Sequence, residues 1–175
     1  ISDDAAIRKR LRGLIVKKGR LVSWAGVEED SVYRLYYAFE QPVSRLQGHQ
    51  ILAINRGERE GKLSVTVLTE DTLALPALCR AVVRPGSAAM EFIRAAAEDA
   101  YDRLLYPSLE REVRALLTEQ AEEGAIRNFA LNLRPLLMQP PVKGRVTMGL
   151  DPGYRNGCKV AVVDGTGKVL DTAVV

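Results

Sequence analysis

The stretch VTMGLDPGYRNGCKVAVVDGTGKVLDTAVV, which runs from Val146 to Val175, decides the fold of the C-terminal part of the chain. Apolar residues alternate in its first part and run together in its middle part, and the second pattern is typical of an interior strand covered on both faces. Turn-forming glycine, proline and aspartate residues separate the apolar segments. The stretch therefore predicts three short antiparallel strands, at 146–150, 159–163 and 169–175.

Asp151 stands at the end of the first of these strands, where an Asp-Pro-Gly turn begins. An aspartate in such a turn often binds its own backbone, and this is one interpretation. The other is a metal ligand, but two-metal phosphoryl chemistry needs several carboxylates around ions about 4 Å apart. Asp164 lies about 20 Å away along the second strand, at about 3.3 Å per residue, and Asp171 on the third strand is also distant. Asp151 therefore has no second ligand within the chain, and no metal site is predicted.

The turn at Gly165-Thr-Gly167-Lys168 has the composition of a phosphate-binding loop but not its pattern. The motif requires a glycine where the chain has Val162, and a serine or threonine where it has Val169. The turn also joins two strands rather than a strand and a helix. It is therefore predicted to be a β-hairpin turn.

Residues 1–138 have mainly helical patterns with a short β part. Apolar side chains recur at helical spacing in most of this region, while β-branched alternation marks Leu63 to Val67 as a strand. Pro107 and Ser108 interrupt the longest helical stretch, so separate helices with short joins and stacked or antiparallel packing are expected. The predicted helices cover 3–18, 49–60 and three segments between 87 and 137, the first of which is capped by Ser87. Residues 73–83 are predicted to form a short helix or two turns, interrupted by Pro76, and a second short strand is predicted at 21–24.

Four aromatic residues gather in the segment from 32 to 39, where Val32 and Leu35 stand between them. Aromatic rings can stack on nucleic-acid bases. The interleaved aliphatic residues favour a small hydrophobic core instead. The rings are those of Tyr33, Tyr36, Tyr37 and Phe39.

Two adjacent prolines in the segment Met138-Gln-Pro-Pro-Val-Lys-Gly144 cannot continue a helix and extend the chain. This segment predicts a domain boundary, with a helical region at 1–138, a linker at 139–145 and a second domain at 146–175. The fold class is thus mainly α with a β part.

One face of the predicted helix 3–18 is basic, and Ser2 or Asp3 is expected to cap the start of this helix. Lysine and arginine side chains release counterions when they bind the phosphates of a nucleic acid. A solvated face that binds nothing is the alternative. The candidate phosphate-binding residues are Arg8, Lys9, Arg12, Lys17 and Lys18.

The composition excludes several classes of protein. The net charge of +3, from 25 basic and 22 acidic residues, permits a nucleic-acid partner without requiring one. No apolar run approaches the roughly 20 residues of a membrane span, so no membrane association is expected. Cys79 and Cys158 lack metal-ligand spacing and are predicted to be buried thiols in a reducing cytoplasm, and His49 is the only histidine. We expect no cofactor.

The chain begins at Ile1 without an initiator methionine and ends at Val175 within a strand pattern. We therefore expect it to be a fragment of a longer protein. An incomplete sheet at 146–175 would expose strand edges, which can recruit a second copy of the chain.

Several segments together resemble the Tex family of RNA-binding transcription accessory proteins. The resemblance covers nearly the whole chain, and its last part is similar to the start of the family's YqgF, or RNase H-like, domain. The segments that carry it are Ile51-Leu-Ala-Ile-Asn-Arg-Gly-Glu58 with Glu60-Gly61, Ala97 to Glu112, Asn132 to Leu137, and Gly149 to Asp164.

The resemblance implies a cytoplasmic protein that binds RNA or DNA and is linked to transcription. It also implies that 146–175 are the first three antiparallel strands of an RNase H-like α/β domain, in which Asp151 matches the first acidic residue of the site. The YqgF domain of the family is thought to lack a full catalytic set, so no enzyme activity is implied. Asn156 and Cys158 depart from the family pattern next to Asp151.

The sequence is compatible with three functions. The first is a scaffold region of a nucleic-acid-binding protein, without catalysis of its own. The second is part of a metal-dependent nuclease that uses Asp151, with further carboxylates supplied from elsewhere. The third is a module that docks onto the transcription machinery.

Overall fold

The computed structural model describes residues 1–27, 30–69, 71–140, 143–153, 155 and 157–175, with the side chains of Asp71 and Thr72 also left undescribed. The chain forms two compact units, Ile1–Asn128 and Phe129–Val175. The last helix of the first unit continues into the second. The predicted division at the linker 139–145 stays a prediction. Within the described residues, no helix has the length and apolar character needed to cross a membrane.

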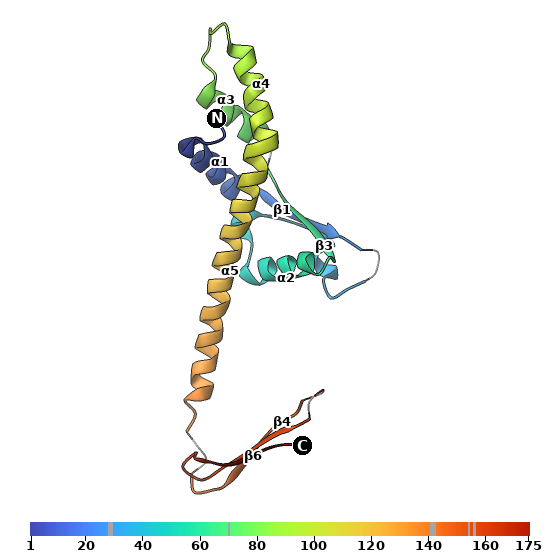
Figure 1. Ribbon diagram of the computed structural model, residues 1–175, viewed down its shortest axis with the longest axis vertical. Helices are drawn as coiled ribbons and strands as arrows, with labels where there is room; N and C mark the ends of the chain where they lie inside the picture. The colour runs from blue at the N-terminus through green and yellow to red at the C-terminus, as the bar shows by residue number, and fades with distance from the viewer. Residues whose placement is uncertain (28–29, 70, 141–142, 154, 156) are drawn as a thin grey trace. The chain divides into compact units, whose positions relative to one another are not determined.

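The first unit contains a three-stranded antiparallel sheet formed by β1 (Arg20–Ala25), β2 (Ala38–Pro42) and β3 (Leu63–Leu68), in the order β2-β1-β3 (Figure 1). The predictions of β1 and β3 are confirmed. β2 was not predicted, because its five residues include Glu40, Gln41 and a final proline, which are typical of edge strands rather than of buried ones.

The first unit also contains three shorter helices: α1 (Ala5–Lys18), α2 (Gly48–Arg59), which packs on β3, and α3 (Asp71–Val82), which packs on α1. The predicted cap of α1 is wrong, because Asp4 and not Ser2 or Asp3 accepts hydrogen bonds, from the amides of Ala6 and Ile7 at 2.8 and 3.0 Å. α2 begins with a glutamine capping box, and Gly61 follows its end with φ 69°, a left-handed conformation that favours glycine. α3 runs through Pro76.

The predicted set of three separate helices between 87 and 137 is wrong, because the chain is helical without interruption from Met90 to Leu137. α4 (Met90–Ala100) leads into a π-turn (Tyr101–Leu105) and then into α5 (Tyr106–Leu137). In the π-turn the Tyr106 amide donates to the carbonyl of Tyr101, and the wider turn accommodates Pro107, which has no amide hydrogen to donate. Ser87 lies before the helix, where its hydroxyl accepts from the amide of Ala89 at 3.2 Å.

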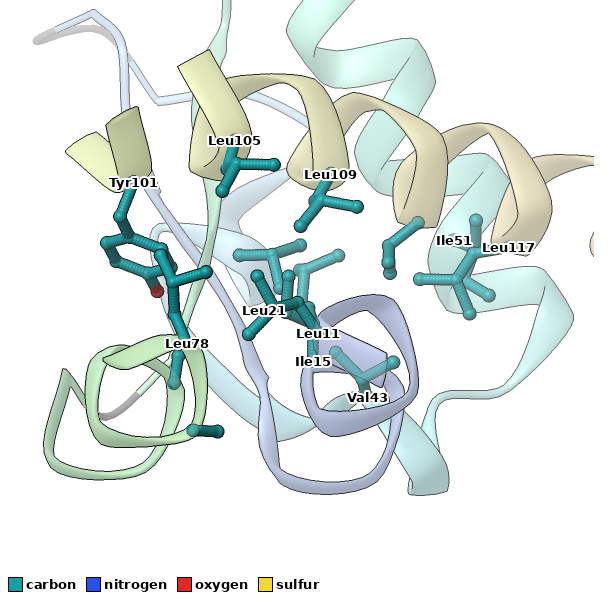
Figure 2. Packing of buried hydrophobic residues seen from close by; sticks show 14 of the residues in the cluster. Leu11, Ile15, Leu21, Val43, Ile51, Leu78, Tyr101, Leu105, Leu109 and Leu117 are labelled. Atoms are coloured by element: carbon teal, nitrogen blue, oxygen red, sulfur yellow. The ribbon is translucent and has the colours of Figure 1, made fainter. Parts of the chain in front are cut away.

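The hydrophobic core of the first unit is formed by α5 together with side chains of α1, α2, α3 and the sheet (Figure 2). The stripe on the π-turn and α5 is almost completely shielded from solvent, as are the facing residues of α1 and β1. These shielded residues are Leu105, Leu109 and Val113 of the long helix, Leu11 and Ile15 of α1, and Leu21 of β1.

The aromatic segment contributes to this core only in part. Tyr33 is buried, and the rings of Tyr36 and Phe39 meet edge to face with centroids 5.4 Å apart. Val32 and Leu35, predicted to lie among them, are instead 88% and 84% exposed.

Hydrogen bonds and an ion pair between side chains join α2 to α5. Arg114 donates to the carboxylate of Glu58, and Asn55 donates to the hydroxyl of Thr118 at 2.8 Å. Gly57 allows the close approach of β3, because a Cβ at this position would lie 2.7 Å from Cδ1 of Leu63. The charged segment 55–61 therefore makes tertiary contacts with α5 besides its internal ion pair between Arg56 and Glu60.

The second unit contains the end of α5 and a sheet of β4 (Thr147–Asp151), β5 (Lys159–Val163) and β6 (Val169–Val174), antiparallel and in that order. The three predicted strands are confirmed. Cys79 of the first unit and Cys158 of the second are both free thiols, and they are half-buried rather than buried.

Candidate nucleic-acid interface

The basic helix α1 has three faces with different surroundings. Leu11 and Ile15, each 1% exposed, point into the core. Arg8 and Arg12 follow next around the helix, one turn apart. The remaining face carries Lys9 and the residues that follow it at helical spacing.

Arg8 and Arg12 both bind one carboxylate on α5. Arg8 donates to Oε1 of Glu112 and also to the hydroxyl of Ser108 at 2.6 Å, and Arg12 donates to Oε2 of Glu112 at 3.2 Å. The hydrogen bond from Arg8 is the main cause that holds the pKa of Glu112 below its ordinary value. Two of the five predicted phosphate-binding residues are thus committed to an internal ion pair.

Lys9 and Lys17 line a hollow of about 430 Å³ between α1 and α3. The two helices lie side by side at one end of the first unit (Figure 1). The hollow is also lined by Arg10, Gly13 and Leu14 of α1 and by Leu73, Ala77 and Arg80 of α3. Because the described lining consists only of aliphatic residues, glycine and basic residues, the hollow has a cationic rim.

The described residues that line this α1–α3 hollow include four cations and no carboxylate. Lys9, Arg10 and Lys17 are exposed to solvent. The Nε of Arg80 donates a hydrogen bond to the carbonyl of Pro76 at 3.3 Å. Such a cluster creates a positive potential that attracts anions such as phosphate groups.

Sequence reasoning missed Arg10 and Arg80 as members of this cluster. Arg10 shares a helical face with Leu14 and Lys17, so a helical-wheel treatment of α1 could have found it. Arg80 has no such signal, because it joins the cluster only through the packing of α3 on α1. Lys18 is exposed in the last turn of α1, where a cation interacts favourably with the helix dipole.

Asp151 ends β4 as predicted, and it lies opposite Lys159 of β5. It lines an open hollow of about 600 Å³ over the sheet, together with residues of all three strands. Within the described part of the chain, no group of three histidine, cysteine, aspartate or glutamate residues is placed to hold a metal ion. Asn156 lies outside the described residues.

Asp164 lies at the opposite end of the sheet from Asp151, as predicted, because Val163 pairs with Thr147 while Lys159 pairs with Asp151. Its Oδ1 accepts hydrogen bonds from the amides of Thr166 and Lys168 at 2.8 and 3.0 Å and from the Thr166 hydroxyl at 2.6 Å. The hydroxyl bond is the main cause that lowers the pKa of Asp164. The segment is therefore a hairpin turn, and the rejection of a phosphate loop is confirmed.

A helix-rich unit with a small sheet is followed by three antiparallel strands, and the first of these strands ends at Asp151. This arrangement fits one class of protein, in which a helical central region is joined to the opening strands of an RNase H-like domain. The chain belongs to the Tex family. Residues 1–129 match the Tex central region-like family, and residues 145–175 match the Tex protein YqgF-like domain.

Several curated proteins are similar to the chain along most of its length. The uncharacterized protein YdcI of Bacillus subtilis is 41% identical over 100% of this chain and 25% of its own length. The human S1 RNA-binding domain-containing protein 1 is 42% identical over 88% of this chain and 16% of its own length. The transcriptional accessory protein Tex of Neisseria gonorrhoeae is 37% identical over 80% of this chain and 19% of its own length. The chain thus spans a quarter or less of the length of these relatives.

Proposed function

We propose that this chain is a scaffold region of a cytoplasmic transcription accessory protein, that it has no catalysis of its own, and that it binds the phosphates of RNA or DNA. The observation that carries the proposal is the α1–α3 hollow, whose described lining has four cations and no carboxylate. Cations that are not already neutralised by carboxylates are the groups that release counterions from a nucleic acid.

The family supports this proposal. One relative is named for an S1 RNA-binding domain and another is named a transcriptional accessory protein. Arg8 and Arg12 contribute less to the proposed interface, since Glu112 already binds both of them. Lys9, Arg10, Lys17 and Arg80 carry it instead, with Lys18 beside them.

The test is fluorescence anisotropy with labelled single-stranded RNA and duplex DNA, at low and moderate salt. The triple variant Lys9→Glu, Arg10→Glu, Lys17→Glu is compared with a matched triple variant, Arg45→Glu, Arg59→Glu, Arg127→Glu. Both variants replace three exposed cations of the first unit by three anions, so they change the net charge equally.

We expect the first variant to weaken binding at least about tenfold and to reduce the dependence of affinity on salt, because phosphate contacts are lost. The control variant should weaken binding much less. Equal losses in the two variants would mean that only net charge matters, and this result would remove the hollow as the binding surface. Absence of binding by the wild-type chain at low salt would contradict the proposal directly.

A nuclease that uses Asp151 is the second candidate, supported by the position of this residue at the end of β4. The reaction would need further carboxylates from outside the described residues. Incubation of the full-length parent protein with magnesium and RNA or DNA tests it. Cleavage that is lost in Asp151→Asn would establish the nuclease and overturn the scaffold proposal for the parent protein.

A third candidate is association with proteins, either with the transcription machinery or with a second copy of the chain. The supporting observation is that β4 and β6 are both edge strands with mostly exposed side chains, including Leu150 and Leu170. Edge strands of this kind can pair with strands of another chain. Sedimentation over a range of protein concentrations tests self-association, and a constant monomer mass would contradict it.

A further inference from the structure

We propose that the α1–α3 hollow takes one unstacked base of a single-stranded nucleic acid, while the cations on its rim hold the neighbouring phosphates. This inference rests on the proposed function. It goes further because it assigns a base-binding site to the aliphatic floor of the hollow and not only a phosphate-binding surface.

The floor of the hollow is aliphatic. It is formed by Leu14 of α1 and by Leu73 and Ala77 of α3, and Leu73 is 37% exposed. Phosphates gain nothing from such a surface, because they lose hydration there without a partner. The flat face of a base is apolar and gains from it.

Gly13 keeps the hollow open on the side of α1. A Cβ built at this position would have no other heavy atom within 4 Å, apart from its chain neighbours and its own helix backbone, so the packing of the protein does not require a glycine here. A glycine within a helix is also unfavourable compared with alanine. The absence of a side chain at Gly13 therefore leaves open space in the wall of the hollow that a ligand can occupy. The volume of about 430 Å³ lies in the range of small-ligand sites.

The cations are placed around this floor rather than within it. Lys9 and Lys17 are separated by about 12 Å along the helix axis, at about 1.5 Å per residue, so they stand at the two ends of the floor. Arg80 adds a cation from α3. This arrangement suits a nucleotide whose base lies on the aliphatic floor and whose backbone continues past Lys9 at one end and Lys17 at the other. A duplex keeps its bases stacked and paired, so it offers only phosphates and sugars to the same surface.

The test fills the hollow without changing charge. Gly13→Leu introduces a side chain into open space and improves helix propensity, so the fold is retained and the melting temperature is unchanged or higher. Gly124→Leu is the matched control, since Gly124 also lies in a helix and a Cβ there would have no heavy atom within 4 Å. The probes are a single-stranded RNA of about 12 nucleotides, a duplex of the same length, and a single strand with abasic sites.

We expect Gly13→Leu to weaken binding of the single strand at least about fivefold, the lower range for loss of one base contact. Binding of the duplex and of the abasic strand should change by less than about twofold, with the same salt dependence. Gly124→Leu should leave the binding of all three probes unchanged.

The experiments can overturn the base site without overturning the proposed phosphate-binding function, and they can also overturn the proposed function itself. If the triple charge reversal of Lys9, Arg10 and Lys17 weakens binding but Gly13→Leu does not, the hollow binds phosphates only and the base site is overturned. If Gly13→Leu weakens binding of the duplex and of the abasic strand as strongly as that of the intact strand, the base site is also overturned. If the charge reversal has no effect beyond that of its control, the proposed function itself fails.

Discussion

Arg8 on α1 and Glu112 on α5 form an ion pair although they lie 104 residues apart in the sequence. The pair is partly buried, with 26% and 34% of the two side chains exposed, and Arg12 adds a second hydrogen bond to the same carboxylate. The pair joins α1 to the long helix beside the core contacts of Leu11 and Ile15. Lys9, Arg10 and Lys17 lie on another side of α1, where they are exposed and form part of the rim of the α1–α3 hollow.

Replacement of Glu112 is expected to reduce stability in a manner that depends on pH. Arg8 lowers the pKa of Glu112 below its ordinary value of 4.5, so the carboxylate stabilises the fold above that pH, and the contribution is lost as the pH falls through the lowered pKa. Glu112→Gln should cost about 0.5–1 kcal/mol near neutral pH and almost nothing in acid below the lowered pKa. Urea unfolding followed by the fluorescence of Trp24, the only tryptophan, measures this in the first unit.

Glu122→Gln is the control for that experiment, because it removes an exposed carboxylate from the same helix. Its effect on the free energy of unfolding should be within about 0.5 kcal/mol at either pH. A loss in Glu112→Gln that is the same in acid and at neutral pH would contradict the role assigned to the ion pair.

Arg114→Met is expected to loosen α2 from α5. The Arg114 side chain is 23% exposed, and its hydrogen bonds to Glu58 are the main cause that raises its pKa. Methionine keeps the apolar stem but leaves Glu58 without its partner, so unfolding should become easier by about 1–2 kcal/mol. Arg111→Met, on the exposed side of α5, should cost less than about 0.5 kcal/mol.

A double-mutant cycle separates this interaction from other effects. Glu58→Gln combined with Arg114→Met should cost less than the sum of the two single changes, by at least about 0.5 kcal/mol. Strict additivity would mean that the two side chains do not interact in solution.

Two helical glycines should respond to alanine in opposite directions. At Gly57 a Cβ would lie 2.7 Å from Cδ1 of Leu63 and 3.1 Å from Cδ1 of Tyr33, so Gly57→Ala should destabilise the fold by about 1–3 kcal/mol through overpacking. At Gly124 a Cβ meets no heavy atom within 4 Å, so Gly124→Ala should stabilise it by about 0.5–1 kcal/mol through helix propensity. Thermal unfolding of the two variants measures both, and a shift in the same direction would contradict the packing described for Gly57.

Asp164→Ala is expected to disorder the hairpin between β5 and β6. The amides of Thr166 and Lys168 lose their common acceptor, so their hydrogen exchange should accelerate. Asp151→Ala serves as the control, since it removes a carboxylate at the other end of the same sheet and should leave exchange at both amides unchanged. Equal acceleration in the two variants would mean that the hairpin depends on the sheet as a whole rather than on Asp164.

Elements whose pattern is local could be predicted from the sequence. The alternation in 63–67 predicted β3, and the turn residues of 164–167 predicted the β5–β6 hairpin, because strand period and turn conformation depend on neighbouring residues. The edge strand β2 was missed because its pairing with β1 compensates for a weak pattern of its own.

The helical run from Met90 to Leu137 shows where local rules are insufficient. Pro107 indicates a break, but the π-turn just before it supplies a different hydrogen-bond pattern, and the buried stripe on both sides stabilises an uninterrupted helix. Packing against α1 and the sheet outweighs the local preference of one proline.

The candidate nucleic-acid interface likewise has features that the sequence determines and features that only the packing of distant segments decides. The sequence by itself determined that α1 is an amphipathic helix with a basic face, because helical period and charge are properties of consecutive residues. The tertiary structure alone decided that Arg12 is paired while Lys9 faces a hollow, because Glu112 and Arg80 reach α1 from distant parts of the chain. The physical reason is that electrostatic interactions depend on distance in space, which packing sets and sequence separation does not.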